Sequence, residues 1–291
     1  MSGAFTVVAP DALQSVQDLL ATDDEAMCMS GGATLVPMLN AGLVEPSLVV
    51  SLKKIPALSG ISRNTDNGIS IGAMTRHVET AASELLVGSL AGVRNAASKI
   101  ANPVVRNMGT MGGSISFADP GADYPPALVA SGAEIEILST EGGRRVPAQD
   151  FFVDWYETAL EPGEIVYAIH LPPADETACG YHEKFARVEG DFATVSVNVV
   201  LALAGENCKS IRIAVGACGP TPVRNADVEQ ALVGKPLSRE ALLEAGKKLA
   251  AECDPVDDVR GSAEYRLNLV PQLVTRAALN AQALLQDEGA A

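Results

Sequence analysis

The chain has 291 residues, enough for two domains with a substantial core. Its composition, 47% hydrophobic but only 4% aromatic, is typical of a packed protein of mixed helix and sheet. The formal net charge of −15 argues against binding to nucleic acid or to an anionic membrane. No apolar run reaches the length of a membrane span, and the N-terminus lacks a secretory signal pattern. We therefore expect no membrane span and a cytoplasmic location.

The first part of the chain predicts short strands and helices in alternation. A helix over 11–20 has apolar residues at helical spacing, with Asp11 placed to cap its start. A strand over 26–29 runs into the turn Ser30-Gly31-Gly32, and a helix over 33–39 follows. This order places N–H groups and the positive end of a helix dipole at the turn. Further strands are expected at 47–52 and 69–73.

The middle of the chain predicts a helix over 84–100, which ends before Asn102-Pro103. A long glycine-rich loop follows, and a short helix over 125–130 comes after it. The alternating strand 134–139 turns back as a hairpin into Arg145 and Val146, and a strand over 164–171 ends at Pro172-Pro173.

A domain boundary is expected near 172–180, because the pattern changes beyond it. The second part predicts three strands rich in Val and Ile, consistent with an antiparallel sheet, over 181–188, 192–204 and 210–218. Three helices are expected after them, over 225–233, 238–252 and 262–285.

The cysteines and histidines do not cluster. Iron–sulfur and structural zinc sites need clustered ligands, and no C-x₂-C pair is present. We therefore expect no metal centre in this chain and five reduced cysteines. The residues concerned are Cys28, Cys179, Cys208, Cys218 and Cys253, with His77, His170 and His182.

Two glycine-rich segments, 30–35 and 109–114, are the most informative feature of the chain. Glycine lets backbone N–H groups approach an anionic ligand, although Gly-Gly pairs also occur at purely structural turns. The spacing fits neither the G-x-G-x-x-G fingerprint of a Rossmann fold nor a Walker loop followed by lysine. The pair therefore favours a pyrophosphate-bearing cofactor held by backbone amides in some other fold.

Several motifs resemble the FAD-binding medium subunits of the molybdenum hydroxylases, a family that includes carbon monoxide dehydrogenase and xanthine dehydrogenase. Residues 30–37 (SGGATLVP) resemble the family pattern AGGT-x-L-x-P. Residues 105–114 (VRNMGTMGGS) resemble VRNRGTIGGS, with Met108 and Met111 departing from it, and 118–125 (ADPGADYP) continue it. Residues 181–187 (YHEKFAR) and 190–193 (GDFA) resemble the start of the family's C-terminal domain.

The resemblance covers nearly the whole chain and implies an α+β fold. It implies a two-subdomain FAD-binding domain of the vanillyl-alcohol-oxidase (PCMH-like) type over 1–176, with its two α/β subdomains divided near 55–60. A C-terminal α+β domain, with an antiparallel sheet and helices, would span 177–291 and close over the flavin.

The resemblance also implies site residues. Two loops would wrap the pyrophosphate with N–H groups and hydroxyls: Cys28, Met29, Ser30, Gly31, Gly32, Ala33, Thr34 and Leu35 in one, and Gly109, Thr110, Met111, Gly112, Gly113 and Ser114 in the other. Ile100 and Val166 would pack on the cofactor, and Asp123 would accept hydrogen bonds from a sugar or ribityl hydroxyl. Lys184 would place a cation near the isoalloxazine, and Phe192 would lie beside the ring.

Three of these residues have other interpretations. Asp123 could cap the helix that begins near Pro125. Lys184 could be an ordinary solvated charge, and Phe192 could belong to the core.

The function that the resemblance implies is electron transfer from the iron–sulfur clusters of a partner subunit through FAD to an external acceptor. A large subunit would hold the molybdenum–pterin cofactor and a small subunit two [2Fe-2S] clusters, in a dimer of heterotrimers. The alternative is a self-sufficient FAD-dependent oxidase or dehydrogenase. The first is favoured because this chain has no metal-binding pattern and no residues that resemble a substrate-oxidising base. The substrate and the final electron acceptor are not specified by the sequence.

Overall fold

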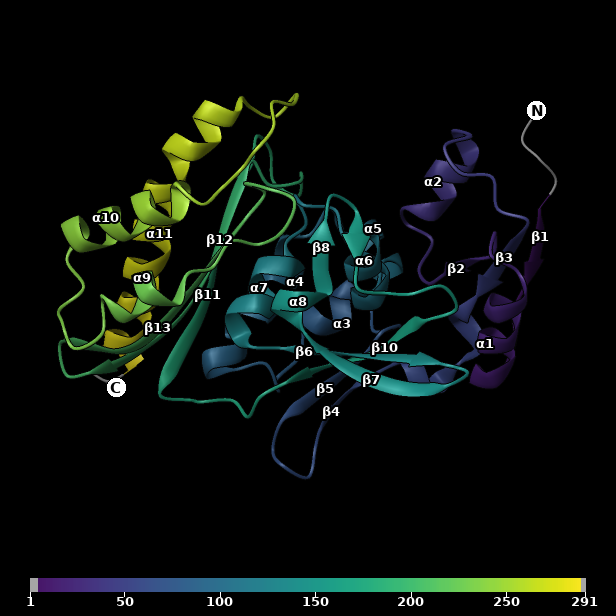
Figure 1. Ribbon diagram of the computed structural model, residues 1–291. Helices are drawn as coiled ribbons and strands as arrows, with labels where there is room; N and C mark the ends of the chain where they lie inside the picture. Colours follow the sequence, from purple (N-terminus) through teal and green to yellow (C-terminus); the bar gives the residue numbers. More distant parts are fainter. Residues whose placement is uncertain (1–4, 289–291) are drawn as a thin grey trace.

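The computed structural model describes residues 5–288, which form three successive parts, each built of one main sheet and its helices (Figure 1). The first is a parallel sheet of three short strands in the order β1-β3-β2, with β1 Thr6–Val8, β2 Met27–Met29 and β3 Leu48–Ser51. Two helices, α1 Leu13–Thr22 and α2 Leu35–Asn40, connect these strands. A small apolar cluster that includes Val16, Val50 and Leu58 holds this part together.

The second sheet is antiparallel, in the order β4-β5-β10-β6-β7. Its strands are β4 Ile61–Arg63, β5 Ile69–Gly72, β6 Glu134–Ser139, β7 Gly142–Pro147 and β10 Ile165–Leu171. The helices of this region are α3 His77–Ala81, α4 Ala91–Lys99, α5 Pro103–Met108, α6 Met111–Phe117, α7 Tyr124–Ser131 and α8 Ala148–Phe151. A small pair, β8 Phe152–Asp154 and β9 Glu157–Thr158, lies between β7 and β10 in the chain, and short 3₁₀ turns cover Leu52–Lys54, Pro56–Leu58 and Gly88–Leu90.

The third sheet is antiparallel, in the order β11-β12-β13, with strands Ala178–Phe185, Val195–Ala204 and Asn207–Gly216. On one side it packs against α10 Arg239–Ala250 and α11 Ala263–Glu288, with α9 Ala226–Gln230 close to β13 (Figure 1). On the other side it meets α4 and α7. Because both faces are covered, β12 is buried over its first eight residues, which are apolar except for Ser196 and Asn198.

Helix α7 is the element that joins the second and third sheets. All eight of its residues are buried, which is typical of a helix surrounded by protein on every side. Its two prolines, Pro125 and Pro126, stand in the first turn, where the backbone N–H groups have no acceptor within the helix. Val200 and Ala214 of the third sheet pack in the same apolar cluster as Leu128 of this helix.

The mixed α+β fold class is confirmed, whereas several expected element bounds are wrong. Asp11 does not cap α1, since the helix begins after Ala12 and no side chain caps it. The helix expected over 84–100 covers only 91–99, because Gly88 has a left-handed φ of 54° and packs against the backbone of Asp175. The boundary after 176 and the division near 55–60 stay predictions.

The segment after Asn102, expected to be a loop, contains two short helices. The side chain of Asn102 accepts a hydrogen bond from the Val105 N–H at 3.0 Å, and Pro103 follows at the first helical position of α5. Thr110 then caps α6 by accepting from the Gly113 N–H at 3.2 Å. Within residues 5–288, no helix combines the length and apolar character needed to cross a bilayer.

Candidate cofactor site

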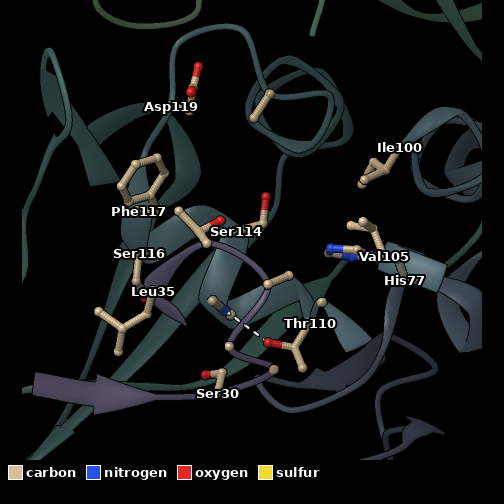
Figure 2. Close-up of a pocket in the computed structure, with 18 of the residues that line it drawn as sticks. Ser30, Leu35, His77, Ile100, Val105, Thr110, Ser114, Ser116, Phe117 and Asp119 are labelled. Carbon is tan, nitrogen blue, oxygen red and sulfur yellow. Dashed lines mark hydrogen bonds between the residues drawn. The ribbon is translucent and has the colours of Figure 1, made fainter. Parts of the chain in front are cut away.

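A cavity of about 560 Å³ lies where the three parts of the fold meet. Figure 2 shows side chains from the first two parts around it, and β11 with the turn after it adds residues from the third. Among the residues predicted from the sequence, the cavity is lined by Cys28, Ser30, Gly31, Gly32, Ala33, Thr34, Leu35, Ile100, Gly109, Thr110, Gly112, Gly113, Ser114, Asp123, Val166, Lys184 and Phe192. Met29 and Met111 are not among the lining residues, and the Met111 side chain is buried in the core of the second part.

The first glycine segment presents unpaired donors. Within the described part of the chain, no protein acceptor is bonded to the N–H groups of residues 31–35, which lie between β2 and the first turn of α2. Gly32 has a left-handed φ of 73°, which turns the chain here. A Cβ on Gly31 would collide with the carbonyl oxygen of Met108, so only glycine lets this segment approach the second one. The turn can therefore offer several N–H groups to one anionic group.

The second glycine segment uses its N–H groups differently from the prediction. The N–H of Met111 donates to the Thr75 carbonyl at 2.9 Å and that of Gly112 to the Ala73 carbonyl at 2.8 Å. The Gly113 N–H is bonded to the Thr110 hydroxyl oxygen. The expectation that N–H groups of 111–113 wrap a pyrophosphate is therefore wrong, because α6 and its contact with the second sheet already use them. What this segment can offer is the N–H of Thr110, which has no acceptor in the described chain, and the hydroxyl group of Ser114; Ser116, two residues further on, adds a second hydroxyl group.

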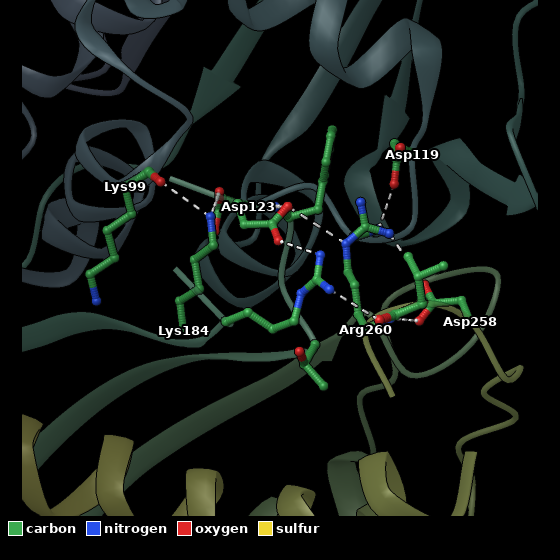
Figure 3. A network of polar contacts seen from close by, with 12 residues as sticks. Lys99, Asp119, Asp123, Lys184, Asp258 and Arg260 are labelled. Atoms are coloured by element: carbon green, nitrogen blue, oxygen red, sulfur yellow. Dashed lines mark hydrogen bonds and ion pairs between the residues drawn. The ribbon is translucent and has the colours of Figure 1, made fainter. Parts of the chain in front are cut away.

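Asp123 and Lys184 form a buried ion pair at the cavity wall (Figure 3). The Lys184 Nζ lies 2.7 Å from Asp123 Oδ2, and the Lys184 side chain is only 6% exposed. The interpretation of Lys184 as a solvated charge is therefore wrong. The capping alternative for Asp123 is also wrong, since its side chain makes no capping hydrogen bond to α7.

His182 completes this network. Its ring is fully buried, and its Nε2 lies 3.0 Å from Asp123 Oδ1, while its Nδ1 has no partner in the described chain. Burial lowers the pKa of His182, so the neutral ring donates its Nε2–H to Asp123. Burial opposes the charge of Asp123, but the hydrogen bonds from His182 and Lys184 and the charge of Lys184 hold its pKa below the usual range.

The same network fixes the C-terminal end of helix α4, next to the cavity. Lys184 Nζ donates to the Lys99 carbonyl at 3.1 Å, and Lys99 Nζ donates to the His182 carbonyl at 2.6 Å. Arg106 donates to the carbonyls of Ile100 and Ala101 at 2.7 and 2.8 Å. These bonds hold Ile100 at the cavity wall.

Phe192 lies at the mouth of the cavity rather than in the core. It is 42% exposed, so the core interpretation is wrong. The Arg260 guanidinium carbon lies 5.4 Å from its ring centroid, and Arg260 also forms an ion pair with Asp258 at 3.2 Å (Figure 3). Nearby, burial raises the pKa of the Asp119 carboxyl.

Sequence reasoning missed several lining residues. Asp119 and Asp191 stand inside the motifs at 118–125 and 190–193, where a closer reading of the acidic positions could have found them. Phe117 and Glu164 carried no signal, and neither did His77, which is separated from both glycine segments by more than thirty residues of sequence. Among the described residues, no three His, Cys, Asp or Glu side chains are grouped to hold a metal ion.

Comparisons with known proteins agree with this geometry. Residues 3–174 match the family model described as the FAD binding domain in molybdopterin dehydrogenase, and 181–281 match the CO dehydrogenase flavoprotein C-terminal domain. The chain is 34% identical to the carbon monoxide dehydrogenase medium chain of Hydrogenophaga pseudoflava, over 95% of this chain and 96% of the relative. It is 33% identical to the 6-hydroxypseudooxynicotine dehydrogenase complex subunit alpha of Paenarthrobacter nicotinovorans, over 94% and 93%.

Solved structures show the same likeness. The carbon monoxide dehydrogenase of Hydrogenophaga pseudoflava matches with a TM-score of 0.93 at 34% identity, over 97% of this chain and 99% of the matched chain. Quinoline 2-oxidoreductase from Pseudomonas putida 86 matches with a TM-score of 0.91 at 32% identity, over 97% and 98%. The chain therefore belongs to the FAD-binding medium-subunit family of the molybdenum hydroxylases.

Proposed function

We propose that this chain binds FAD in the central cavity and serves as the electron-transfer subunit of a molybdenum-dependent hydroxylase or dehydrogenase. The observation that carries the proposal is the row of unbonded N–H groups at residues 31–35, which line the cavity next to Gly109. Such a row suits a pyrophosphate, whose oxygens accept several hydrogen bonds at once. Glycine at position 31 also suits a pyrophosphate, because a Cβ there would strike the Met108 carbonyl oxygen where the two glycine segments meet.

The rest of the cavity suits the remainder of FAD. Ser114 and Ser116 would add hydroxyl groups, while Ile100 and Val166 would pack on the cofactor from opposite elements. The ion pair would face the flavin with Lys184 on β11 and Asp123 just before α7, and Phe192 would lie beside the ring at the mouth. When bound, FAD supplies an electron carrier that receives electrons from an iron–sulfur partner and passes them to an external acceptor.

The partners follow from the family. Relatives of this chain are named as a medium chain and as a subunit of a dehydrogenase complex. We propose that a large subunit with the molybdenum–pterin cofactor oxidises the substrate, and that a small subunit with two [2Fe-2S] clusters passes the electrons on. Assembly as a dimer of heterotrimers and a cytoplasmic location are the finer parts of this proposal.

The test is to purify the native protein from its own host and to identify what it carries. Denaturation should release one non-covalent FAD per chain, and two further subunits should copurify. Gly31→Ala should lose FAD, because the new methyl group would strike the Met108 carbonyl oxygen. Gly219→Ala is the matched control, since a Cβ there has its nearest neighbour at 3.5 Å, an ordinary contact. Release of FMN, or a single chain with full substrate-oxidising activity, would contradict the proposal.

A further inference from the structure

His77 is a buried histidine of the cavity wall with one ring nitrogen engaged and the other free. It is 4% exposed, and its Nδ1 lies 3.1 Å from the Tyr124 hydroxyl. The two rings are 5.4 Å apart and tilted by 54°. Nε2 has no hydrogen-bond partner within residues 5–288, and His77 lines the cavity (Figure 2). Nε2 is not one of the fully buried unpaired atoms of the described chain, so it is open to the cavity and free to bond a ligand there.

The position of Nε2 indicates which part of a ligand it would meet. A Cβ built on Gly109 would lie 2.6 Å from Nε2, so glycine at 109 leaves this nitrogen uncovered. A Cβ on Gly31 would in turn lie 3.0 Å from the Gly109 Cα. The His77 N–H also donates to the Gly109 carbonyl at 3.1 Å, which fixes helix α3 against this residue. Nε2 is therefore held beside the junction of the two glycine segments.

The hydrogen-bond partner of Nδ1 determines what Nε2 can do. Burial lowers the pKa of His77 to about 4, with a smaller raising effect of Asp123 and a lowering effect of Arg106, so the ring is neutral at pH 7. A phenol is a better donor than a neutral imidazole, whose unprotonated nitrogen is a strong acceptor. We therefore assign the Tyr124 hydroxyl as the donor to Nδ1, and this assignment puts the single ring proton on Nε2. The ring thus presents an N–H donor to the cavity without carrying a charge.

We infer that the Nε2–H of His77 donates a hydrogen bond to a pyrophosphate oxygen of the cofactor, with Tyr124 as the positioning residue that fixes the tautomer. The inference rests on the proposed FAD site and adds a side-chain donor to the backbone donors of 31–35. It also compensates for the second glycine segment, whose N–H groups at 111–113 are already bonded within the protein.

Two variants of the full-length chain, freed of flavin, separate the two halves of the ring. His77→Asn keeps a polar atom near the place of Nδ1, for Tyr124, and removes the donor at the Nε2 position. His77→Gln keeps a donor close to the Nε2 position. His170→Asn is the matched control, because His170 is bonded to Ser70 and Glu136 and does not line the cavity.

The measurements are the FAD dissociation constant by calorimetry, the ³¹P resonances of bound FAD and its visible spectrum. We expect His77→Asn to weaken FAD binding about tenfold, as for one lost hydrogen bond to a charged group, and to shift the ³¹P resonances while the flavin bands stay in place. His77→Gln and the His170 control should bind within about threefold of the wild type.

Two results would overturn the inference: unchanged affinity in His77→Asn, or a changed flavin spectrum with unmoved ³¹P resonances, which would put the ring against the flavin instead. Failure of the wild type to bind FAD would refute the proposed function itself, which is a different outcome.

Discussion

At the scale of single residues, Asp123 and Lys184 have to be considered together. Lys184 Nζ and Asp123 Oδ2 lie 2.7 Å apart in a buried setting. The negative charge of Asp123 therefore largely cancels the electrostatic effect of the lysine on a cofactor in the cavity. The sequence pattern identified both residues as lining a flavin site, but it could not show that they pair with each other. Pairing depends on the packing of β11 against α4 and of α7, which Asp123 precedes, against β12 and β13; Asp123 and Lys184 are about sixty residues apart in the chain.

The first prediction is that single variants of this pair shift the flavin potential in opposite directions. Lys184→Met leaves the Asp123 charge unbalanced, which disfavours a reduced, anionic flavin and lowers the potential. Asp123→Asn leaves the lysine charge unbalanced and raises it. A redox titration of both variants measures this, and the double variant should fall between them. Potentials that move in the same direction would show that the pair does not act on the flavin through charge.

The same pair makes a second prediction, about acid stability. The pKa of Asp123 is lowered in the folded state, so its stabilisation is present above the unfolded pKa of about 4 and is lost as the pH falls further. Without Lys184, burial dominates and raises that pKa. Lys184→Met should therefore lower the free energy of unfolding by about 3–5 kcal/mol at pH 7. The fall of that free energy below about pH 4, which the wild type owes to Asp123, should be smaller in the variant. Urea unfolding from pH 3 to pH 7 would measure both effects, with an exposed lysine variant, Lys247→Met, as the control.

His77 provides a third prediction, with a different pH window. Its folded pKa of about 4 is below its ordinary value, so the neutral ring stabilises the fold above about pH 6.5, and protons favour the unfolded chain as the pH falls toward 4. This histidine alone should reduce the unfolding free energy by about 2 kcal/mol between pH 7 and pH 5. His77→Gln should remove that part of the pH dependence. An identical slope in the variant and the wild type would show that His77 does not titrate in this way.

At the scale of elements, the glycine segments show where prediction from sequence succeeds and where it fails. The turn at 30–34 was predicted well, because a short apolar run followed by Ser-Gly-Gly is a strong local signal for a strand and a turn. The segment 102–117 was predicted as a loop because glycines suggest one. Instead it contains two short helices, because Asn102 and Thr110 each cap the start of one. Glycine here serves packing against the second sheet, which no local pattern reveals.

This difference makes a fourth prediction, which separates two glycines of one site. A Cβ on Gly112 would lie 2.5 Å from the Cβ of Ala73, inside the contact of α6 with the second sheet. Gly112→Ala should therefore lower the stability of the flavin-free protein by about 1–3 kcal/mol through overpacking. Gly31→Ala would strike the Met108 carbonyl oxygen outside the apolar clusters of the fold, so it should lose FAD with a smaller effect on the flavin-free protein. Thermal unfolding with and without FAD distinguishes them; equal losses of stability without FAD would contradict the distinction.

At the scale of the whole molecule, the cavity belongs to no single part of the fold. The first part supplies the backbone donors at 31–35, the second supplies α6 and His77, and the third supplies Lys184 and Phe192. The sequence motifs predicted the contributors at 31–35, Lys184 and Phe192, but not α6, which was expected as a loop, nor His77, which stands in no motif. They could not predict which parts depend on one another for stability, because that follows from buried faces between sheets rather than from any motif.

The last prediction concerns this dependence. Helix α7 is buried on all sides, in part by Val200 and Ala214 of the third sheet, which share its apolar cluster. A chain cut after residue 176, at the predicted boundary, would leave α4 and α7 with uncovered apolar faces. We expect the fragment 1–176 to bind a hydrophobic dye, to unfold without cooperativity and to bind FAD weakly. Adding the fragment 177–291 should restore a cooperative transition by covering these faces. Cooperative unfolding of 1–176 alone, at the temperature of the full chain, would show instead that the first two sheets and their helices are an independent unit on which the third part only rests.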